Sequence, residues 1–200
     1  MTRSSTEAAT YNRYFYIGSE PRVPINKLGI KDRALLEEAE GLLVELRVAQ
    51  GLPRKALQLT YAGFKAIHHH LFQDLFDWAG KERTYTTARN PIVSFAQPEH
   101  ITGWMEAQFI SLRGDNYLRG LDRTVFAQKA AVLVNEINAA HPFIDGNGRV
   151  QRLWLQIVAE QAGYRVEIHR QDREAWNEAA RIGFLRSSEP MARFIFERMA

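Results

Sequence analysis

The chain of 200 residues contains no cysteine. This absence excludes disulfide bonds and metal sites built from thiolates. It fits a reducing compartment, so we expect the protein to be cytoplasmic. The chain also has no apolar run near the ~20 residues that cross a bilayer, so we expect no membrane insertion. Residues 1–10 are small and polar and lack the apolar segment of a signal peptide, so we expect a frayed leader.

Neither sign of charge dominates the sequence. Lysine and arginine number 26 against 23 acidic residues, and the formal net charge is +3. The acids are interspersed with the arginines, whereas nucleic-acid binding favours a basic stripe with interleaved aromatic residues. We therefore expect no direct contact with nucleic acid. The length and an apolar content of 46% are sufficient for one domain with a core.

Apolar residues recur at helical spacing along most of the chain. This periodicity predicts helices over residues 31–50, 59–72, 98–112, 124–140, 149–162, 172–181 and 188–199. Thr60 is a predicted helix cap, and Gly163 is a predicted helix stop. Pro142 disfavours helical geometry for His141, so a helix should end there. The fold class is therefore mainly α.

Several side chains receive a structural interpretation from this pattern. The first predicted helix carries six apolar residues on one stripe: Leu35, Leu36, Ala39, Leu42, Leu43 and Leu46. Trp78, Trp104 and Trp154 are expected in the core. The run His68-His69-His70 resembles a metal site, but consecutive helical residues point in different directions, so structural or surface histidines are favoured.

Two segments depart from the helical pattern. Residues 84–95 are rich in Thr, Tyr and Val around Asn90-Pro91, which predicts a short β-hairpin or extended flap. Residues 11–30 are rich in aromatic residues, Pro and Gly, which indicates an arm packed on the domain surface. We accordingly assign residues 1–25 to a partly disordered N-terminal arm and residues 26–200 to the domain.

The segment 141–152 reads His-Pro-Phe-Ile-Asp-Gly-Asn-Gly-Arg-Val-Gln-Arg and predicts a polyphosphate site. Gly146 and Gly148 allow positive φ and a close approach of the backbone to a ligand. The first N–H groups of the following helix have no internal partner, and the helix dipole favours an anion there. Arg149 and Arg152 lie on one helix face, and guanidinium groups bind phosphate as a fork.

The same segment holds an acid, an amide and a base. Asp145 is the only acid in the loop, so it is the expected ligand for Mg²⁺, which takes one or two carboxylates with phosphate oxygens and waters. Asn147 can donate its side-chain amide to a phosphate oxygen. His141 is then free to act as the general base, since its unperturbed pKa of ~6.5 is close to the operating pH.

Three other interpretations of this loop fit its residues less well. It is not a Walker A motif, because no Lys-Ser or Lys-Thr follows the glycines. A calcium-binding EF-hand register would put Phe143 and Trp154 at the two end ligand positions, where neither can bind the ion. A glycine-rich turn with a capping Asp would leave the histidine, the asparagine and both arginines unexplained.

The segment 141–152 matches every fixed position of the pattern His-Pro-Phe-x-(Asp/Glu)-Gly-Asn-Gly-Arg-x-x-Arg, which is that of Fic-domain proteins. Supporting similarity occurs at Ile67-His68, Leu71-Phe72, the run Phe76 to Lys81, Arg83, Phe95-Ala96, Glu136-Ile137-Asn138 and Ala162-Gly163-Tyr164. The chain thus resembles this family from about Asn26 to its C-terminus. The resemblance implies the all-α Fic fold, a helical bundle with one short β-hairpin flap before the central helices.

The resemblance also implies a reaction, the transfer of AMP from ATP to a hydroxyl side chain of a target protein. By this resemblance His141 deprotonates the hydroxyl group and Asp145 holds Mg²⁺ between the α- and β-phosphates. The implied nucleotide-binding residues are Gly146, Asn147 and Gly148 around the α- and β-phosphates, Arg149 at the β-phosphate and Arg152 at the γ-phosphate.

The resemblance places target docking on the flap, with Thr87, Ala88, Arg89, Val93, Ser94 and Phe95 as the docking residues. Without the resemblance, this hairpin would be a plain surface feature. Trp176 and Phe184 follow the motif at a distance that makes them candidates for an adenine pocket, with core packing as the alternative.

Many Fic proteins carry an inhibitory helix with the pattern (Ser/Thr)-x-x-x-Glu-(Gly/Asn). Glu40-Gly41 is the one Glu followed by Gly or Asn here, and Leu36 stands where Ser or Thr is needed. The inhibitory pattern is therefore absent, and the resemblance implies a toxin held inactive by a separate small antitoxin whose Glu reaches Arg152. Similar toxins modify the ATPase subunits of type II topoisomerases, which makes those subunits a candidate target.

Two alternatives to AMP transfer stay open at this point. A Fic-type enzyme can use another donor and transfer UMP or phosphate. The kinase branch has Lys in place of the second motif glycine, and Gly148 keeps the AMP-type loop. The chain could also be a scaffold without catalysis, against which the intact His141, Asp145 and Arg152 argue.

Overall fold

The computed structural model describes residues 13–19, 21–88, 94–185 and 187–200 of the chain. The helices within these residues are α2 (Arg33–Ala49), α3 (Tyr61–Phe72), α4 (Pro98–Gly114), η1 (Asn116–Leu118), α5 (Arg123–Ala140), α6 (Asn147–Ala162), η2 (Arg170–Asp172), α7 (Arg173–Leu185) and α8 (Glu189–Glu197). In this part of the chain, β-structure is limited to isolated bridges. The predicted all-α fold class is confirmed.

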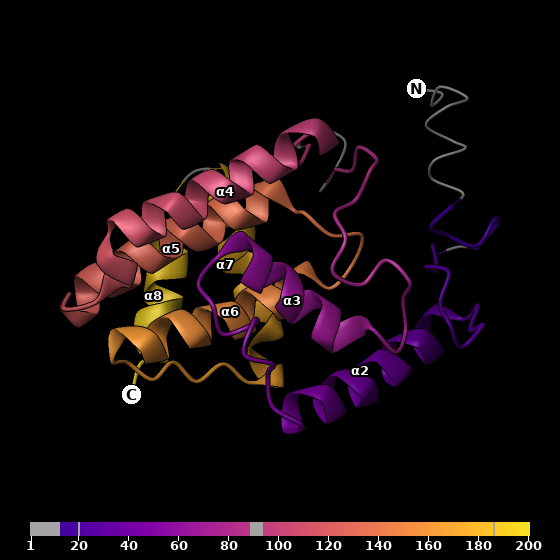
Figure 1. Ribbon diagram of the computed structural model, residues 1–200, viewed down its shortest axis with the longest axis horizontal. Coiled ribbons are helices and arrows are strands. Elements are labelled where there is room, and N and C mark those ends of the chain that lie inside the picture. Colours follow the sequence, from indigo (N-terminus) through magenta and orange to yellow (C-terminus); the bar gives the residue numbers. More distant parts are fainter. Residues whose placement is uncertain (1–12, 20, 89–93, 186) are drawn as a thin grey trace.

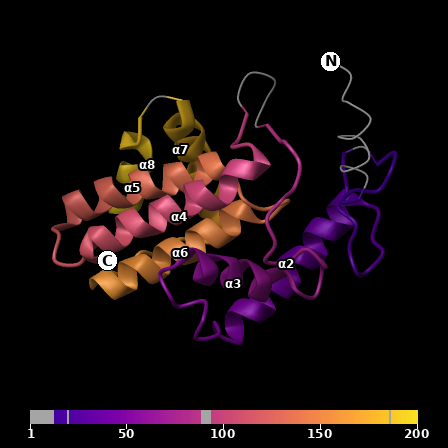
Figure 2. The same ribbon diagram turned by 45° about the horizontal axis from the view of Figure 1, so that its top comes forward.

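Helix α5 is the centre of the bundle. It packs against α4, α6, α7 and α8, while α3 joins α2 to α6 (Figure 1). Its buried face consists mostly of small and branched apolar side chains between Phe126 and Ala140, which allow close helix packing. Figure 2 shows α2 and α3 side by side at the edge of the group formed by α4 to α8. The 141–152 segment connects the end of α5 to the first turns of α6, so it lies at a junction of the core helices.

The predicted helix ends are confirmed by the caps. Thr60 Oγ1 accepts the N–H of Gly63 at 3.1 Å and begins α3. Helix α5 ends at Ala140, and His141 takes left-handed geometry with φ 45° and ψ 61°. Gly163 ends α6. Helix α6 begins two residues earlier than its predicted start at Arg149, at Asn147.

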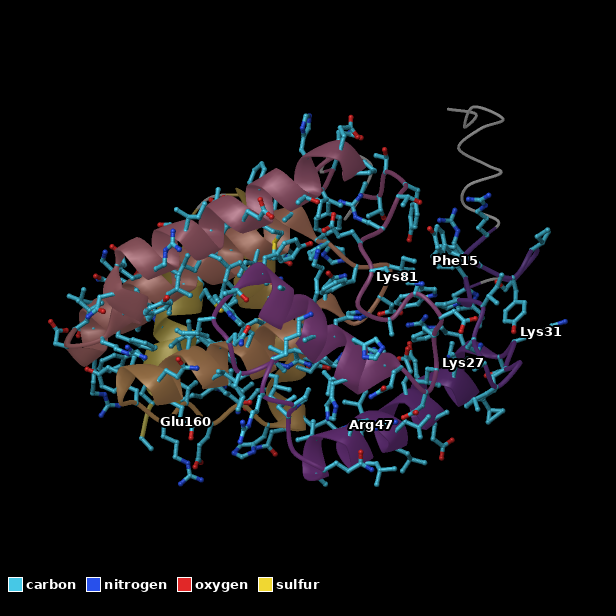
Figure 3. All side chains as sticks on the ribbon, in the orientation of Figure 1. Phe15, Lys27, Lys31, Arg47, Lys81 and Glu160 are labelled. Atoms are coloured by element: carbon cyan, nitrogen blue, oxygen red, sulfur yellow. The ribbon has the colours of Figure 1, made fainter. Side chains whose placement is uncertain are left out.

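Helix α2 divides the predicted apolar stripe between the core and solvent. Leu36 is fully buried, whereas Leu35, Leu42 and Leu46 are 55%, 65% and 52% exposed. The helix packs mainly on α3, so only a narrow arc of its surface is covered. Arg47 projects from this helix (Figure 3). Its guanidinium donates two hydrogen bonds to Asp74, from Nε to Oδ2 at 2.6 Å and from Nη2 to Oδ1 at 2.5 Å.

The three tryptophans predicted to lie in the core differ. Trp78 and Trp154 are buried, as expected. The prediction is wrong for Trp104, which is 39% exposed. The helix α4 that carries Trp104 turns Ile101, Met105, Phe109 and Leu112 inward. A residue three positions after Ile101 lies at the margin of that buried face.

The described parts of the flap pair as a hairpin requires. Phe95 N–H donates to the Thr87 carbonyl at 3.1 Å, and Ala88 and Ser94 form an antiparallel bridge. The predicted docking residues Arg89 and Val93 lie outside the described residues.

Part of the predicted N-terminal arm packs on the domain. Phe15 and Pro24 form an antiparallel bridge, and Val23 is buried. Residues 1–12, which include the predicted leader, lie outside the described part. No helix in the part of the chain described is both long and apolar enough to span a bilayer.

Candidate active site

Asn147 clamps the loop between α5 and α6. Its Oδ1 accepts the N–H of Phe143 at 2.9 Å, and its Nδ2 donates to the Phe143 carbonyl at 2.8 Å. The side chain is buried, and both polar ends serve the loop itself. The predicted phosphate contact from this amide stays a prediction. The structural role of closing the loop is one that the sequence did not indicate.

The two loop glycines serve different purposes. Gly146 has φ 79°, and a Cβ there would lie 2.4 Å from the ring of Phe72, so both backbone and packing require glycine. Gly148 was also expected to use positive φ, but it lies in the first turn of α6 with helical geometry. A Cβ at Gly148 would lie 3.4 Å from Nη1 of Arg152. Gly148 therefore leaves open the space between the helix start and that guanidinium.

The start of α6 has backbone donors of the kind that an anion site requires. The N–H groups of Asn147 and Gly148 belong to the first turn, where helical donors have no internal acceptor. The positive end of the helix dipole lies at the same place. The N–H of Gly146 differs, because it donates to Asp145 Oδ1 at 2.6 Å. The loop therefore orients its own acid with one amide and leaves later amides for a ligand.

His68 bridges the loop and the turn after α3. These contacts confirm the predicted structural role of this histidine. The N–H of Gly80 donates to His68 Nδ1 at 2.8 Å, so the ring proton is on Nε2 and donates to the Asp145 carbonyl at 3.1 Å. The ring packs against Phe143 and Phe72. Burial lowers the pKa of His68 to about 3, so the ring is neutral at neutral pH.

Helix α2 brings two charged residues to the loop that sequence reasoning missed. Glu40 is 2% exposed, and its Oε2 accepts from Arg149 Nη2 at 2.8 Å. Arg33 donates to Asp145 Oδ2 at 3.4 Å from both Nη1 and Nη2. Burial raises the pKa of Glu40, and the nearby Arg149 opposes that shift. The available signal was a charged residue between Leu36 and Leu43 on the buried side of α2.

Arg149 is thus surrounded by compensating groups. Besides Glu40, its Nη2 lies 3.8 Å from Asp145 Oδ1. Its guanidinium also lies over the ring of Phe72, 4.8 Å from the centroid. The loop arginine predicted to meet the β-phosphate is therefore held by the protein before any nucleotide binds.

Arg152 has the opposite environment. Among the residues that the structure describes, it makes no hydrogen bond or ion pair, and its guanidinium lies over Trp176 at 5.8 Å. Burial lowers the pKa of Arg152 to about 10, and repulsion from Arg149 and Arg173 contributes, while the charge of Asp172 opposes the shift. A desolvated cation that lacks a salt bridge is costly unless an anion joins it. This cation lies beside the open amides of α6, so the site can bind an anion there.

The predicted base is held against the flap. The rings of His141 and Phe95 stack with centroids 3.9 Å apart and an interplanar angle of 15°. The half-buried Phe184 meets Phe95 edge-on at 5.7 Å. Three residues named from distant parts of the sequence are therefore neighbours in space. A role for Phe184 at an adenine ring stays a prediction.

Trp176 fits the core-packing alternative. It is 1% exposed and contacts Phe194 edge-to-face at 5.6 Å. Its ring also lies under the guanidinium of Arg152 and supports that side chain.

Asp145 is the one predicted metal ligand in the loop. Its side chain is 27% exposed. Within the described residues, no group of three or more His, Cys, Asp or Glu side chains could hold a metal ion. Any Mg²⁺ would therefore need most of its oxygens from a nucleotide and water, which is the usual way for this ion. The donor set fits a metal that arrives with its nucleotide.

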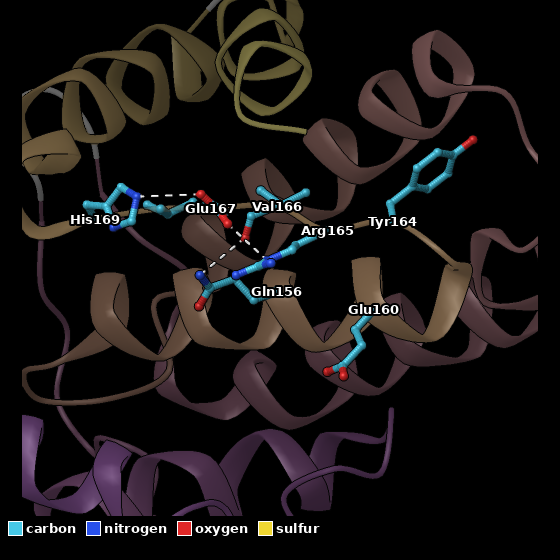
Figure 4. Close-up of a pocket in the computed structure, with 8 residues that line it drawn as sticks. Gln156, Glu160, Tyr164, Arg165, Val166, Glu167 and His169 are labelled. Carbon is cyan, nitrogen blue, oxygen red and sulfur yellow. Dashed lines mark hydrogen bonds and ion pairs between the residues drawn. The ribbon is translucent and has the colours of Figure 1, made fainter. Parts of the chain in front are cut away.

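A separate cavity of about 440 Å³ lies along α6 (Figure 4). Its lining comprises Gln156, Glu160, Tyr164, Arg165, Val166, Glu167, Ile168 and His169. None of the predicted site residues lines it. Arg165 pairs with Glu167 at 2.9 Å, and Gln156 donates to the Val166 carbonyl at 3.3 Å. The polar groups that could bind a ligand there are partly satisfied by each other.

Comparison with known proteins shows the family of the chain. Residues 58–159 match the Fic/DOC family. The chain belongs to this family. The matched region runs from α3 through most of α6 and includes the flap and the 141–152 loop.

Curated relatives of this Fic chain carry related names. It is 33% identical over 182 residues to the protein adenylyltransferase VbhT of Bartonella schoenbuchensis, covering 90% of this chain and 38% of that protein. It is 32% identical over 180 residues to the probable protein adenylyltransferase Fic of Escherichia coli, covering 85% and 83%. The chain thus spans well under half of VbhT but most of the Escherichia coli relative.

Solved structures share the Fic fold. The BepC protein of Bartonella tribocorum, solved with bound AMPPNP, aligns with a TM-score of 0.79 at 27% identity, covering 94% of this chain and 97% of that one. The N-terminal Fic domain of a Bartonella quintana effector, solved with bound ADP, aligns with a TM-score of 0.80 at 26% identity, covering 94% and 95%.

Proposed function

We propose that this protein transfers AMP from ATP to a hydroxyl side chain of a target protein. The observation that carries the proposal is Arg152, a half-buried cation that forms no salt bridge among the described residues and lies beside the open amides of α6. Relatives named protein adenylyltransferases support it, as do related structures that hold AMPPNP or ADP.

In the proposed reaction His141 accepts the proton of the target hydroxyl. The oxygen then attacks the α-phosphorus, a new P–O bond forms, and the bond to the β-phosphate bridging oxygen breaks. Pyrophosphate leaves with the electron pair of that bond, and the target carries an AMP ester. Stacking on Phe95 holds the imidazole in one plane, which is the kind of preorganisation that general-base catalysis needs.

The phosphates would lie along the start of α6. The first-turn N–H groups of Asn147 and Gly148 and the fork of Arg152 bind anionic oxygens. Arg149 donates to Glu40 through Nη2, and its other N–H groups can turn toward the β-phosphate. Charge that develops on the departing pyrophosphate is therefore met by fixed donors.

Asp145 would hold the Mg²⁺ that accompanies ATP. A bound Mg²⁺ supplies charge neutralisation on the phosphates. The Asp145 Oδ1 atom is oriented by the N–H of Gly146, and Oδ2 has only the long contacts to Arg33. An acid held in this way can exchange a weak contact for a metal without moving the loop.

Labelled ATP tests the reaction and its alternatives together. The chain and its His141→Ala variant are incubated with bacterial lysate and ATP labelled at either the α- or the γ-phosphate. Covalent α-label that requires His141 supports AMP transfer. Covalent γ-label would instead support phosphate transfer, and no label from either donor would support a non-catalytic scaffold. Labelled UTP in a parallel reaction tests UMP transfer.

We further propose that the protein is a cytoplasmic toxin that a small antitoxin inhibits. The antitoxin would carry the pattern (Ser/Thr)-x-x-x-Glu-(Gly/Asn) and place its Glu on Arg152. The environment of Glu40 supports this, because the one Glu-Gly of this chain engages Arg149 and leaves Arg152 open. Use of ATP fits the cytoplasm, and the ATPase subunits of type II topoisomerases are the proposed target.

Growth assays test the inhibited pair. Expression of the chain should arrest growth, and His141→Ala should abolish the arrest. Co-expression of a neighbouring small protein with the inhibitory pattern should restore growth, and replacement of its Glu by Ala should remove the protection. Purified topoisomerase ATPase subunits should take up α-label; unlabelled subunits would eliminate that target.

A further inference from the structure

Arg83 is buried among backbone carbonyl groups rather than acids. It is 1% exposed. Its Nε donates to the His141 carbonyl at 2.8 Å, Nη1 to Tyr85 at 2.7 Å, and Nη2 to Ala96 at 2.5 Å and Ala140 at 3.1 Å. Within the described residues, no carboxylate contacts this guanidinium. Its charge is therefore balanced by peptide dipoles alone, and burial lowers its pKa.

Two of these carbonyls belong to the end of α5. The last carbonyls of a helix have no internal donor and carry the negative end of the dipole. Residues after a helix commonly supply the missing N–H groups, but Pro142 has none. Arg83 supplies them from a distant part of the chain. Its own backbone N–H also donates to the Pro142 carbonyl at 2.8 Å.

The other two carbonyls lie at the two stems of the flap. Tyr85 is on the stem that leads into it, and Ala96 is on the stem that leaves it. Ala96 N–H in turn donates to the Ala139 carbonyl at 3.0 Å. One guanidinium therefore joins both flap stems to the backbone of His141.

A second contact joins the same parts through side chains. Phe95, adjacent to Ala96, stacks on the His141 ring. Arg83 holds the backbone of His141, and Phe95 holds its imidazole. Phe95 belongs to the flap, and Arg83 binds both flap stems. Movement of a stem would consequently change the direction in which the imidazole points.

We propose that Arg83 is a positioning residue that fixes the His141 imidazole relative to the two flap stems at Tyr85 and Ala96, so that the base keeps one direction toward the target hydroxyl. This inference rests on the proposed function, since it assigns His141 the role of general base. Arg83 itself touches neither nucleotide nor target in this scheme. Its effect should therefore appear in turnover and not in ATP affinity.

The test compares Arg83→Lys with Arg123→Lys. Lysine keeps the charge of Arg83 but cannot reach four carbonyls with a planar fork. Arg123 serves as the control, because it also donates to a backbone carbonyl, that of Met199 at 2.6 Å, although it is exposed and Arg83 is buried. It begins α5, at the opposite end from His141. Circular dichroism establishes that each variant is folded.

The kinetic measurement is transfer of α-label from ATP to one labelled lysate protein as ATP is varied. Arg83→Lys should lower the rate at saturating ATP by about 10²-fold, the cost of a misplaced reacting group. The KM for ATP should stay within about twofold, because the phosphate donors are unchanged. Arg123→Lys should behave as the wild type. An unchanged turnover, or a KM that rises as much as turnover falls, overturns the proposal.

A geometric measurement separates this inference from the proposed function. The nuclear Overhauser effect between the ring protons of Phe95 and His141 should be present in wild type and Arg123→Lys and lost in Arg83→Lys. Its persistence in Arg83→Lys overturns the inference even if the chain transfers no AMP. If Arg83→Lys does not fold, the wild-type Nε–H of Arg83 decides. Slow solvent exchange of that proton supports the buried contact, and exchange as fast as that of exposed arginines overturns it.

Discussion

The two arginines of the active-site loop lie three residues apart on one helix and occupy opposite electrostatic environments. Arg149 contacts Glu40, Asp145 and an aromatic ring, whereas Arg152 contacts an aromatic ring and, among the described residues, forms no salt bridge. The difference comes from their neighbours, because α2 brings Glu40 to Arg149, and α7 brings Trp176 and Arg173 to Arg152. One arginine braces the loop, and the other is left for a ligand.

Removal of the open cation should have the largest effect on activity. Arg152→Ala should lower kcat/KM for AMP transfer by about 10²–10³-fold, the usual cost of a lost charge-stabilising donor. Its thermal stability should be unchanged or higher, because a desolvated cation is removed. Kinetics of α-label transfer and thermal unfolding measure these two properties, and titration calorimetry with ATP measures the accompanying loss of affinity. A wild-type ATP affinity in Arg152→Ala would break the comparison.

Removal of the braced cation should instead lower stability. Arg149→Ala leaves the Glu40 carboxylate buried without its partner, which should cost about 2–3 kcal/mol, since Arg149 is partly exposed and the full loss for a buried pair is larger. Urea unfolding measures this free energy. The double variant Arg149→Ala with Glu40→Gln should recover part of the loss. Equal stability of Arg149→Ala and Arg152→Ala would contradict the assignment of a brace.

The two loop glycines differ in the same way, because Gly146 stabilises the fold and Gly148 leaves room for a ligand. Gly146→Ala should destabilise the fold by about 1–3 kcal/mol, because it combines left-handed backbone with a clash against Phe72. Gly148→Ala has helical geometry and only a tight approach to Arg152 Nη1, so its stability should change little. For Gly148→Ala, the loss of ATP affinity should exceed what its small loss of stability would explain. The reverse order in unfolding experiments would show that the loop is not braced at Gly146.

The pH dependence of stability tests the contribution of His68, which lies under the loop. The pKa of His68 is about 3 in the folded protein against 6.5 for the free side chain. The unfolded state therefore binds the proton first as pH falls, and stability that is complete above pH 6.5 is lost progressively toward pH 3. The slope should approach about 1.4 kcal/mol per pH unit within this window. Urea unfolding at pH 7 and pH 5 should show this loss in wild type and not in His68→Gln.

The sequence predicted what depends on neighbours along the chain. Thr60, Pro142 and Gly163 mark helix ends through local backbone chemistry, and the structure agrees. The loop residues also share one local stretch, so their proximity was assured. Contacts across the fold were not predictable in this way.

Glu40 and Arg33 reach the loop from more than a hundred positions away, at separations of 109 and 112 residues. Their helical spacing indicates which side of α2 they occupy but not what lies opposite. The same limit explains Trp104 and the exposed leucines of α2, because apolar periodicity exceeds the surface that neighbouring helices cover. Arg83 is similar: its type suggests a surface charge, and only the folded chain supplies the carbonyls that surround it.

The turn after α3 has a consequence for mutational surveys of this protein. Gly80 holds His68 through one amide, and His68 holds the carbonyl of Asp145 through the other side of its ring. A side chain at Gly80 would meet Cβ of His69 at 2.9 Å in a backbone with φ 79°. A random library should therefore collect inactive clones at this turn. Those clones would resemble active-site mutants in phenotype, although the altered position never meets a nucleotide.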